Sequence, residues 1–136
     1  MIVIDTHILV WAMQDDPRLG AQARRIIDEM TEKSRILISA ITPWEIVMLV
    51  QKGRLALGDD VGRWIDSALA LAGLDLAPIE PSIAVDSVRL PGAFHADPAD
   101  RLIVATARHH RVPLMTADQV ILGYGARGHL QVLSAD

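Results

Sequence analysis

The sequence has no cysteine among its 136 residues. This absence excludes a disulfide framework, a zinc site built on thiolates and a cysteine nucleophile. The chain also lacks any run of about 18 apolar residues, the length that a membrane-spanning helix needs. Met1 leads directly into a short apolar stretch without a preceding basic segment, so we expect no signal peptide, no membrane association and a cytoplasmic protein.

Basic residues are also few, with 13 lysines and arginines against 17 acidic residues and a net charge of −4. A free nucleic-acid-binding domain usually carries a basic surplus. The balance still fits such a role if several acids form one metal site, because bound cations would partly cancel their charge. The apolar fraction of 51% is high for a small domain and indicates apolar surface reserved for a partner.

Strand and helix signals alternate along the chain, without an internal repeat, a linker or a low-complexity tract. Apolar runs predict five strands, at residues 2–4, 35–40, 74–79, 114–116 and 130–133. Helical periodicity and capping signals predict helices at 6–13, 16–31, 43–52, 81–90 and 98–110, and a further one that begins after Asp59-Asp60. This order predicts a single α/β domain over residues 1–136, with a mainly parallel sheet of four to five strands between helices.

Acidic residues stand where the apolar runs give way to helices. Asp5, Glu45 and Asp118 each follow a predicted strand, and Asp97 and Asp100 open the helix at 98–110. In a parallel sheet, residues just past the carboxyl ends of the strands gather at one edge, where ligands bind. Carboxylates collected there repel one another unless a cation lies between them. A divalent metal is therefore expected, and hydrolysis of a phosphodiester is the reaction that such a site most often supports.

Each of these acids also has an ordinary explanation as a helix cap. The segment from Thr42 to Glu45 has the form of a capping box, and Asp97 and Asp100 have the positions of a cap and a first-turn acid. For any single acid, capping is the better explanation. Capping alone does not explain why several strand ends carry an acid where serine or asparagine would also cap the helix. A metal site explains this preference for acids.

Four segments resemble PIN-domain ribonucleases, and among these the VapC-like toxins of prokaryotic toxin–antitoxin modules. The similarity covers nearly the whole chain in the same order and spacing, and it rests on Asp5-Thr6-His7 followed by Trp11, on Trp44-Glu45, on His95-x-Asp97-Pro98-x-Asp100-Arg101-Leu102-Ile103-x-Ala105, and on Thr116-Ala117-Asp118. The resemblance implies a PIN-like three-layer α/β/α sandwich and an Mg²⁺- or Mn²⁺-dependent endoribonuclease. It also implies a homodimer that a small antitoxin protein neutralises.

The resemblance further assigns roles to the acids and to two hydroxyls. It implies a catalytic, metal-binding quartet of Asp5, Glu45, Asp100 and Asp118, in which the three aspartates hold one metal ion. Asp97 resembles an additional acid of this group, either a ligand or the cap that orients Asp100. The hydroxyls expected to hold the carboxylates or a metal-bound water are those of Thr6 and Thr116.

Three further residues are candidates for contact with the RNA substrate. His95 could contact a phosphate, although an ordinary hydrogen bond within its loop is the more common role. Arg101 could clamp a phosphate or pair with a neighbouring acid, and the sequence does not decide between them. Relatives often carry a lysine four residues after the glutamate, where this chain has Leu49. Whether Lys52, one turn further on, replaces that lysine is open.

Other function classes fit less well. A phosphoacceptor signalling domain needs a lysine at its last strand, and the only lysines are Lys33 and Lys52. An aspartyl phosphatase wants a second acid two residues after Asp5, where His7 stands. The main alternative is a catalytically silent PIN-like fold that acts as a protein- or RNA-binding module. Degenerate members would be expected to lose acids, and this chain keeps them all.

The segment Ile46–Val50 is apolar on every side of its predicted helix. Such a helix must be covered all round, by the core or by another chain. A domain of this size has little core to surround it, so we expect a partner there. Together with Trp11, Trp44 and Trp64, the helix is a candidate groove for the antitoxin.

Overall fold

The computed structural model of the protein describes residues 1–33 and 35–136. Its centre is a five-stranded sheet in the order β3-β2-β1-β4-β5, and every neighbouring pair of strands is parallel. The prediction of a parallel sheet is thus confirmed. The strands are β1 (Ile2–Ile4), β2 (Ile36–Ser39), β3 (Leu74–Ala77), β4 (Leu114–Thr116) and β5 (Val132–Ser134).

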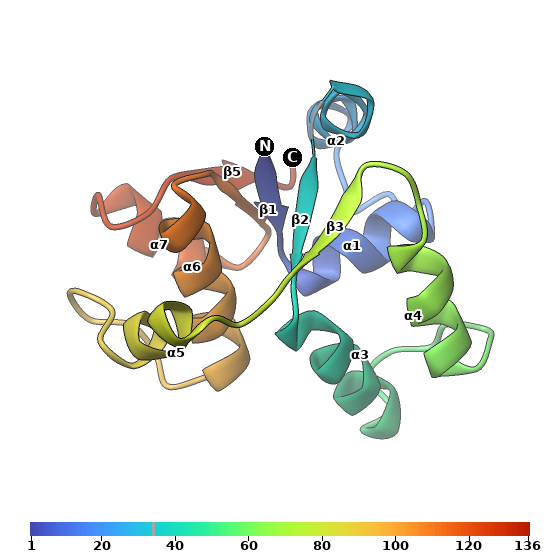
Figure 1. Ribbon diagram of the computed structural model, residues 1–136. Coiled ribbons are helices and arrows are strands. Elements are labelled where there is room, and N and C mark those ends of the chain that lie inside the picture. The colour runs from blue at the N-terminus through green and yellow to red at the C-terminus, as the bar shows by residue number, and fades with distance from the viewer. Residues whose placement is uncertain (34) are drawn as a thin grey trace.

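Helices cover both faces of this sheet and form the three predicted layers (Figure 1). One face carries α1, α2 and α4, and the other carries α5, α6 and α7, while α3 lies beyond the carboxyl end of β2. Within the described ranges, no helix is long and apolar enough to cross a lipid bilayer. The helices are α1 (Thr6–Met13), α2 (Ala21–Lys33), α3 (Ile41–Gln51), α4 (Val61–Leu69), α5 (Pro81–Val88), α6 (Pro98–His110) and α7 (Gln119–Ala126).

The strands supply alternate side chains to two separate hydrophobic cores. Successive side chains of a strand point to opposite faces, so a strand covered on both faces must be apolar throughout. In β1, Ile2 and Ile4 join the core beneath α1 and α2, while Val3 joins the core beneath α5, α6 and α7. This double burial explains why β1, β2 and β4 appear in the sequence as nearly continuous apolar runs, whereas the outer strands β3 and β5 are partly exposed.

Two predicted helix starts are wrong, each because a local hydrogen bond replaces the expected cap. The helix predicted from residue 16 begins at Ala21, since Asp16 instead accepts the backbone N–H of Arg18 at 2.9 Å. The helix predicted from residue 43 begins at Ile41, whose N–H donates to the Ser39 hydroxyl at 3.3 Å. Thr42 therefore lies inside α3 and is not the cap of a capping box.

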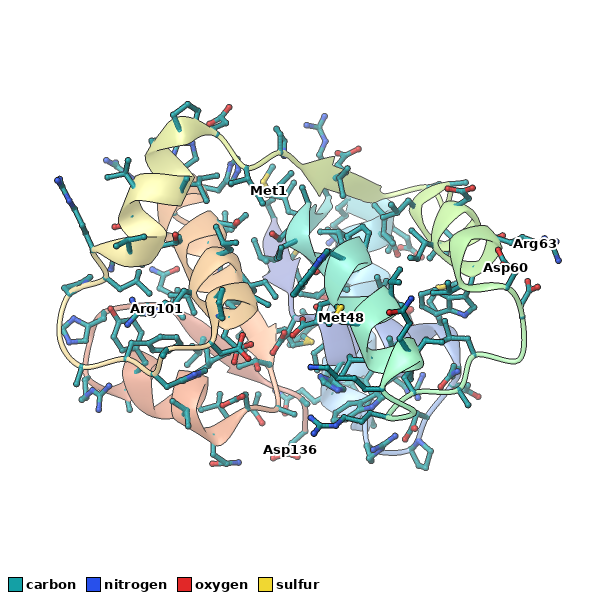
Figure 2. All side chains as sticks on the ribbon, turned by 90° about the horizontal axis from the view of Figure 1, so that it is seen from below. Met1, Met48, Asp60, Arg63, Arg101 and Asp136 are labelled. Atoms are coloured by element: carbon teal, nitrogen blue, oxygen red, sulfur yellow. The ribbon has the colours of Figure 1, made fainter. Side chains whose placement is uncertain are left out.

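The order of the strands places an opening in the fold next to β1. From β1 the chain moves outward through β2 to β3, then returns to the other side of β1 for β4 and continues outward to β5. The crossovers leave β1 and β4 in opposite directions, and such a switch point creates a crevice at the carboxyl ends of the strands. Figure 2 views this edge, with α3 and α6 side by side across it.

Ile103 lies on the buried face of α6 and has no exposed surface, so its truncation should have a large effect on stability. Ile103→Ala should lower the free energy of unfolding by about 2–5 kcal/mol, because it removes buried carbons and leaves a cavity. Val88 on α5 is 79% exposed, and Val88→Ala should change stability by no more than about 0.5 kcal/mol. Urea unfolding measures both, and equal losses would contradict the packing described.

Candidate metal centre

An acidic cavity of about 380 Å³ opens at the carboxyl edge of the sheet. The structure brings all five predicted acids to its wall, from the ends of β1 and β4, from α3 and from the first turn of α6. A phosphodiester group and metal ions fit a space of this size. The residues lining the cavity are Asp5, His7, Trp11, Glu45, Leu49, Asp97, Asp100, Ala117 and Asp118.

Asp5 is the most deeply placed of the acids, with 6% of its surface exposed. Its Oδ1 accepts the backbone N–H of Thr6 at 2.7 Å, and its Oδ2 accepts the Thr116 hydroxyl at 2.6 Å. The Thr116 hydroxyl in turn accepts the backbone N–H of Asp118 at 3.0 Å. Burial raises the pKa of Asp5, while the bond from Thr116 acts in the opposite direction. Thr116 thus holds together the ends of β1 and β4.

The acids at the helix starts are caps as well as cavity residues. Asp97 Oδ1 accepts the N–H of Asp100 at 3.1 Å at the start of α6. Asp118 Oδ1 accepts the N–H groups of Val120 and Ile121 at 2.8 and 3.2 Å at the start of α7. A carboxylate has two oxygens, so a capping bond to one does not prevent the other from binding a metal. Capping and metal binding are therefore compatible at these positions.

Glu45 carries a buried oxygen that the described protein leaves without a partner. Its Oε1 has no hydrogen-bond donor among the described residues. Burial raises the pKa of Glu45, and the negative charges of Asp5 and Asp97 raise it further. A buried polar atom without a partner is costly and calls for an explanation, such as an ion or a water. A bound cation would satisfy this oxygen.

Asp100 feels the charges of all the other acids of the cavity. Burial, followed by the negative charges of Asp5, Asp97, Glu45 and Asp118, raises the pKa of Asp100 to about 8. At neutral pH the metal-free cavity therefore favours a proton on this carboxyl group. A divalent cation can replace that proton and stabilise the charged form.

The donor atoms lie close enough to share metal ions. Atoms from Glu45, Asp97 and Asp100 all lie within 4.8 Å of one another, and so do atoms from His95, Asp100 and Asp118. Asp100 belongs to both groups. Carboxylate oxygens dominate the donor set, and Mg²⁺ and Mn²⁺ prefer such ligands. The residues present thus fit the hard divalent cation that the sequence predicts.

His95 lies at the wall between the cavity and the neighbouring loop. Its Nε2 is 3.2 Å from Asp100 Oδ2, and its Nδ1 accepts the N–H of Asp97 at 3.3 Å. Because Nδ1 acts as an acceptor, a neutral ring carries its proton on Nε2. This atom is buried and has no properly directed hydrogen-bond partner in the described ranges. The geometry makes His95 a donor toward the acidic cavity.

The structure does not bring His95, Arg101 or Lys52 into the cavity lining. The Arg101 guanidinium donates to the carbonyl oxygens of His95, Ser87 and Phe94 at 2.8, 3.1 and 2.9 Å. Figure 2 shows Arg101 beside the loop that precedes α6. Lys52 caps the far end of α3 and is exposed.

Three lining residues had no role in the sequence-based site. His7 and Trp11 are four residues apart on α1, so they share one side of the helix, and their ring centroids are 6.1 Å apart. Their positions in the sequence, two and six residues after Asp5, are the signal that identifies both residues as neighbours of this acid. Leu49 stands at the position where relatives often carry a lysine. It lines the cavity together with His7 and Trp11, and the three give it a partly apolar wall.

Comparisons with known proteins agree with this geometry. A family model described as "PIN domain" matches residues 2–125. The chain is 32% identical over 118 residues to "Ribonuclease VapC22" of Mycobacterium tuberculosis, a match that covers 87% of each protein. The family match at residues 2–125 includes every residue that lines the acidic cavity.

Solved structures with similar folds come from several bacteria. VapBC2 of Rickettsia felis, crystallised with a DNA fragment from its promoter, has a TM-score of 0.72 at 18% identity and covers 98% of both chains. A toxin–antitoxin complex from Klebsiella pneumoniae has a TM-score of 0.66 at 23% identity, covering 100% of this chain and 98% of that chain. FitAcB of Neisseria gonorrhoeae has a TM-score of 0.68 at 21% identity, covering 99% and 98%.

These structural matches support the fold. The family match and the 32% identity show that the amino-acid sequence is similar as well. The order of elements, the parallel sheet and the acidic cavity are those expected of such a protein. The chain therefore belongs to the PIN-domain family, as a VapC-like member of it.

Proposed function

We propose that the protein is a metal-dependent endoribonuclease toxin that hydrolyses RNA phosphodiester bonds with Mg²⁺ or Mn²⁺. It acts in the cytoplasm, and a small cognate antitoxin neutralises it. The observation that carries the proposal is the convergence of five carboxyl groups on one cavity, where burial and the charges of the other four raise the pKa of Asp100 to about 8. The VapC-like sequence supports the same activity.

Two groups of donor atoms meet at Asp100, one with His95 and Asp118 and one with Glu45 and Asp97, and Asp5 lies beside them in neither group. Asp5, Asp100 and Asp118 would hold one ion, and Glu45 would complete a second site or orient the attacking water. Asp97 would add an oxygen beside Glu45 while it caps α6. When bound, the ion supplies Lewis acidity and lowers the pKa of a coordinated water. Glu45 Oε1, buried and unpartnered within the described chain, would hold a cation or accept a proton at this edge of the cavity.

The two threonines support the reaction without contacting the substrate. Thr116 donates to Asp5 and accepts from the Asp118 backbone, so it fixes both carboxylates relative to each other. The Thr6 hydroxyl lies 3.1 Å from the Thr42 hydroxyl, which ties α1 to α3 and thereby holds the helix that carries Glu45. Both bonds keep the ligands in one arrangement before a metal arrives.

Among the predicted RNA contacts, His95 has the best placement. Its buried Nε2 lies 3.2 Å from Asp100 Oδ2, so His95 can act on the cavity through Asp100 and not by direct contact with a phosphate there. The three carbonyl bonds of Arg101 favour a role in holding the loop at residues 87–95 over a role in phosphate binding. Lys52 lies outside the cavity, and its proposed role is a contact with RNA further along the strand.

The surface of α3 supports a protein partner. Its apolar residues were predicted to be covered all round, yet within this helix only Thr42 and Ile46 are fully buried, and Trp44 is 55% exposed. Trp11 and Trp64 pack in or against the core, so the proposed groove has one exposed tryptophan and not three. We propose that an antitoxin covers α3 and that the toxin is a homodimer. Similar solved structures are toxin–antitoxin complexes.

A catalytically silent binding module is the alternative function. Such a module would have no need for five converging acids or for an unpartnered glutamate oxygen. A titration with Mg²⁺ or Mn²⁺ separates the two possibilities, because a silent module should show little affinity for either ion.

Removal of a metal ligand should abolish RNA cleavage. We expect Asp5→Asn and Asp100→Asn each to reduce the cleavage rate by more than about 100-fold. Thr116→Val should reduce the rate by about 10–100-fold, because the loss of the Thr116 hydroxyl disturbs only the orientation of Asp5. Purified protein and labelled total RNA provide the assay, with EDTA as a second means of abolishing activity. The control is Asp66→Asn on the exposed side of α4. Normal cleavage by either aspartate variant would contradict the assignment.

The raised pKa of Asp100 predicts an unusual pH dependence of stability in the metal-free protein. The folded protein keeps this proton up to about pH 8, whereas the unfolded chain releases it near the ordinary value of 3.8. Between these values the unfolded state binds fewer protons, so the free energy of unfolding should fall as the pH rises.

The size of this fall should be on the order of a few kcal/mol between pH 5 and 8, measured by urea unfolding in EDTA. Asp100→Asn should flatten the profile, and Asp66→Asn should leave it unchanged. Equal slopes in the wild-type protein and in Asp100→Asn would show that Asp100 does not carry the effect.

A further inference from the structure

A second cavity, of about 410 Å³, lies directly beside the acidic one. It opens between the loop before α6 and the exposed side of α7. Two features join the cavities. His95 lines the second cavity, and its Nε2 is 3.2 Å from Asp100 of the acidic cavity. Gln119 lines the second cavity and directly follows Asp118 of the acidic cavity in the sequence. A polymer with one phosphate at the metal centre therefore has a neighbouring unit within reach of this second cavity.

The walls of this second cavity combine aromatic, cationic and amide groups. The Phe94 ring stacks on His95 with centroids 4.5 Å apart and an interplanar angle of 28°. Arg127 donates to the Ala93 carbonyl at 2.8 Å, which fixes its guanidinium at the rim. The Gln119 side chain adds a donor and an acceptor. Single-stranded RNA is recognised by such groups, through stacking of bases on aromatic rings and contacts of arginine with phosphate.

Gly123 gives an independent indication that the open space has a function. It lies inside α7, where glycine weakens a helix relative to alanine. Gly125 in the same helix is explained by packing, since a Cβ there would lie 2.6 Å from the Val132 methyl groups. At Gly123 a Cβ would meet no described atom within 4 Å, and the residue lines the second cavity. Packing within the chain does not require this glycine, and the space beside it is free for a ligand.

We propose that this second cavity binds the nucleotide adjacent to the scissile phosphate, with its base over Gly123 against the Phe94–His95 pair and its phosphate toward Arg127. The inference rests on the proposed endoribonuclease activity and adds a binding site to it. The charge favours RNA over a basic peptide segment, because Arg127 attracts a phosphate and repels a cationic side chain.

Gly123→Leu tests the site, because the new side chain should occupy the cavity without displacing any part of the protein. We expect KM for RNA to rise about tenfold, the loss of one stacked base, while kcat changes less than about twofold. Gly123→Ala is the matched control and should retain the wild-type KM. Thermal unfolding of both variants should match or exceed the wild type. Wild-type KM in Gly123→Leu, or a loss of kcat alone, would overturn the proposal.

A second measurement does not depend on cleavage. Metal-free, ¹⁵N-labelled protein is titrated with each of the four nucleoside 5′-monophosphates at millimolar concentration. We expect saturable shifts of the Gly123 and Gln119 amide signals, which Gly123→Leu should abolish and Gly123→Ala should retain. No shift with any nucleotide, or shifts only with a hexa-arginine peptide, would overturn the nucleotide site.

The two experiments also separate this inference from the proposed function. Binding of nucleotides to a protein that cuts no RNA would support the site and contradict the nuclease. Metal-dependent cleavage that is unaffected by Gly123→Leu would support the nuclease and contradict the site.

Discussion

Mutual repulsion among carboxyl groups in one partly buried cavity is the constraint on which the account of this protein depends. Four neighbouring acids and burial together raise the pKa of Asp100 to about 8, which is far from the ordinary value of 3.8. A fold that gathers so much negative charge is under strain unless a proton or a cation neutralises it. The strain therefore both identifies the site and supplies affinity for a divalent ion, because binding the ion relieves it.

The backbone produces this convergence, and the side chains then stabilise it. Strands β1 and β4 are neighbours, and their crossovers leave in opposite directions, so the residues after them face the same crevice. The helices that begin there need capping groups, and carboxylates meet that need with one oxygen. At Asp97 and Asp118 the other oxygen remains for a ligand, whereas both oxygens of Asp5 already accept hydrogen bonds. Thr116 joins the two strand ends by accepting one bond and donating another. Structural and functional requirements on these acids thus coincide.

Much of the fold and of the acidic cavity could be predicted from the sequence, because both follow from local patterns. The bounds of α6 were predicted correctly, since Asp97-Pro98 is an unambiguous helix start. Errors arose where a short-range pattern competed with tertiary contacts. Thr42 has the spacing of a cap, but it packs inside α3 against Thr6. Arg101 follows Asp100 in sequence, but helical geometry turns it toward a loop that no local pattern specifies. The second cavity has no sequence motif at all.

The most direct test of the metal centre measures how many protons a metal ion displaces. Isothermal titration of the protein with Mn²⁺ at pH 7, in two buffers of different ionisation enthalpy, gives that number. Because Asp100 has a pKa of about 8, the account predicts release of close to one proton per protein on binding, and almost none in Asp100→Asn. Absence of Mn²⁺ binding, or binding to the wild-type protein without proton release, would contradict it.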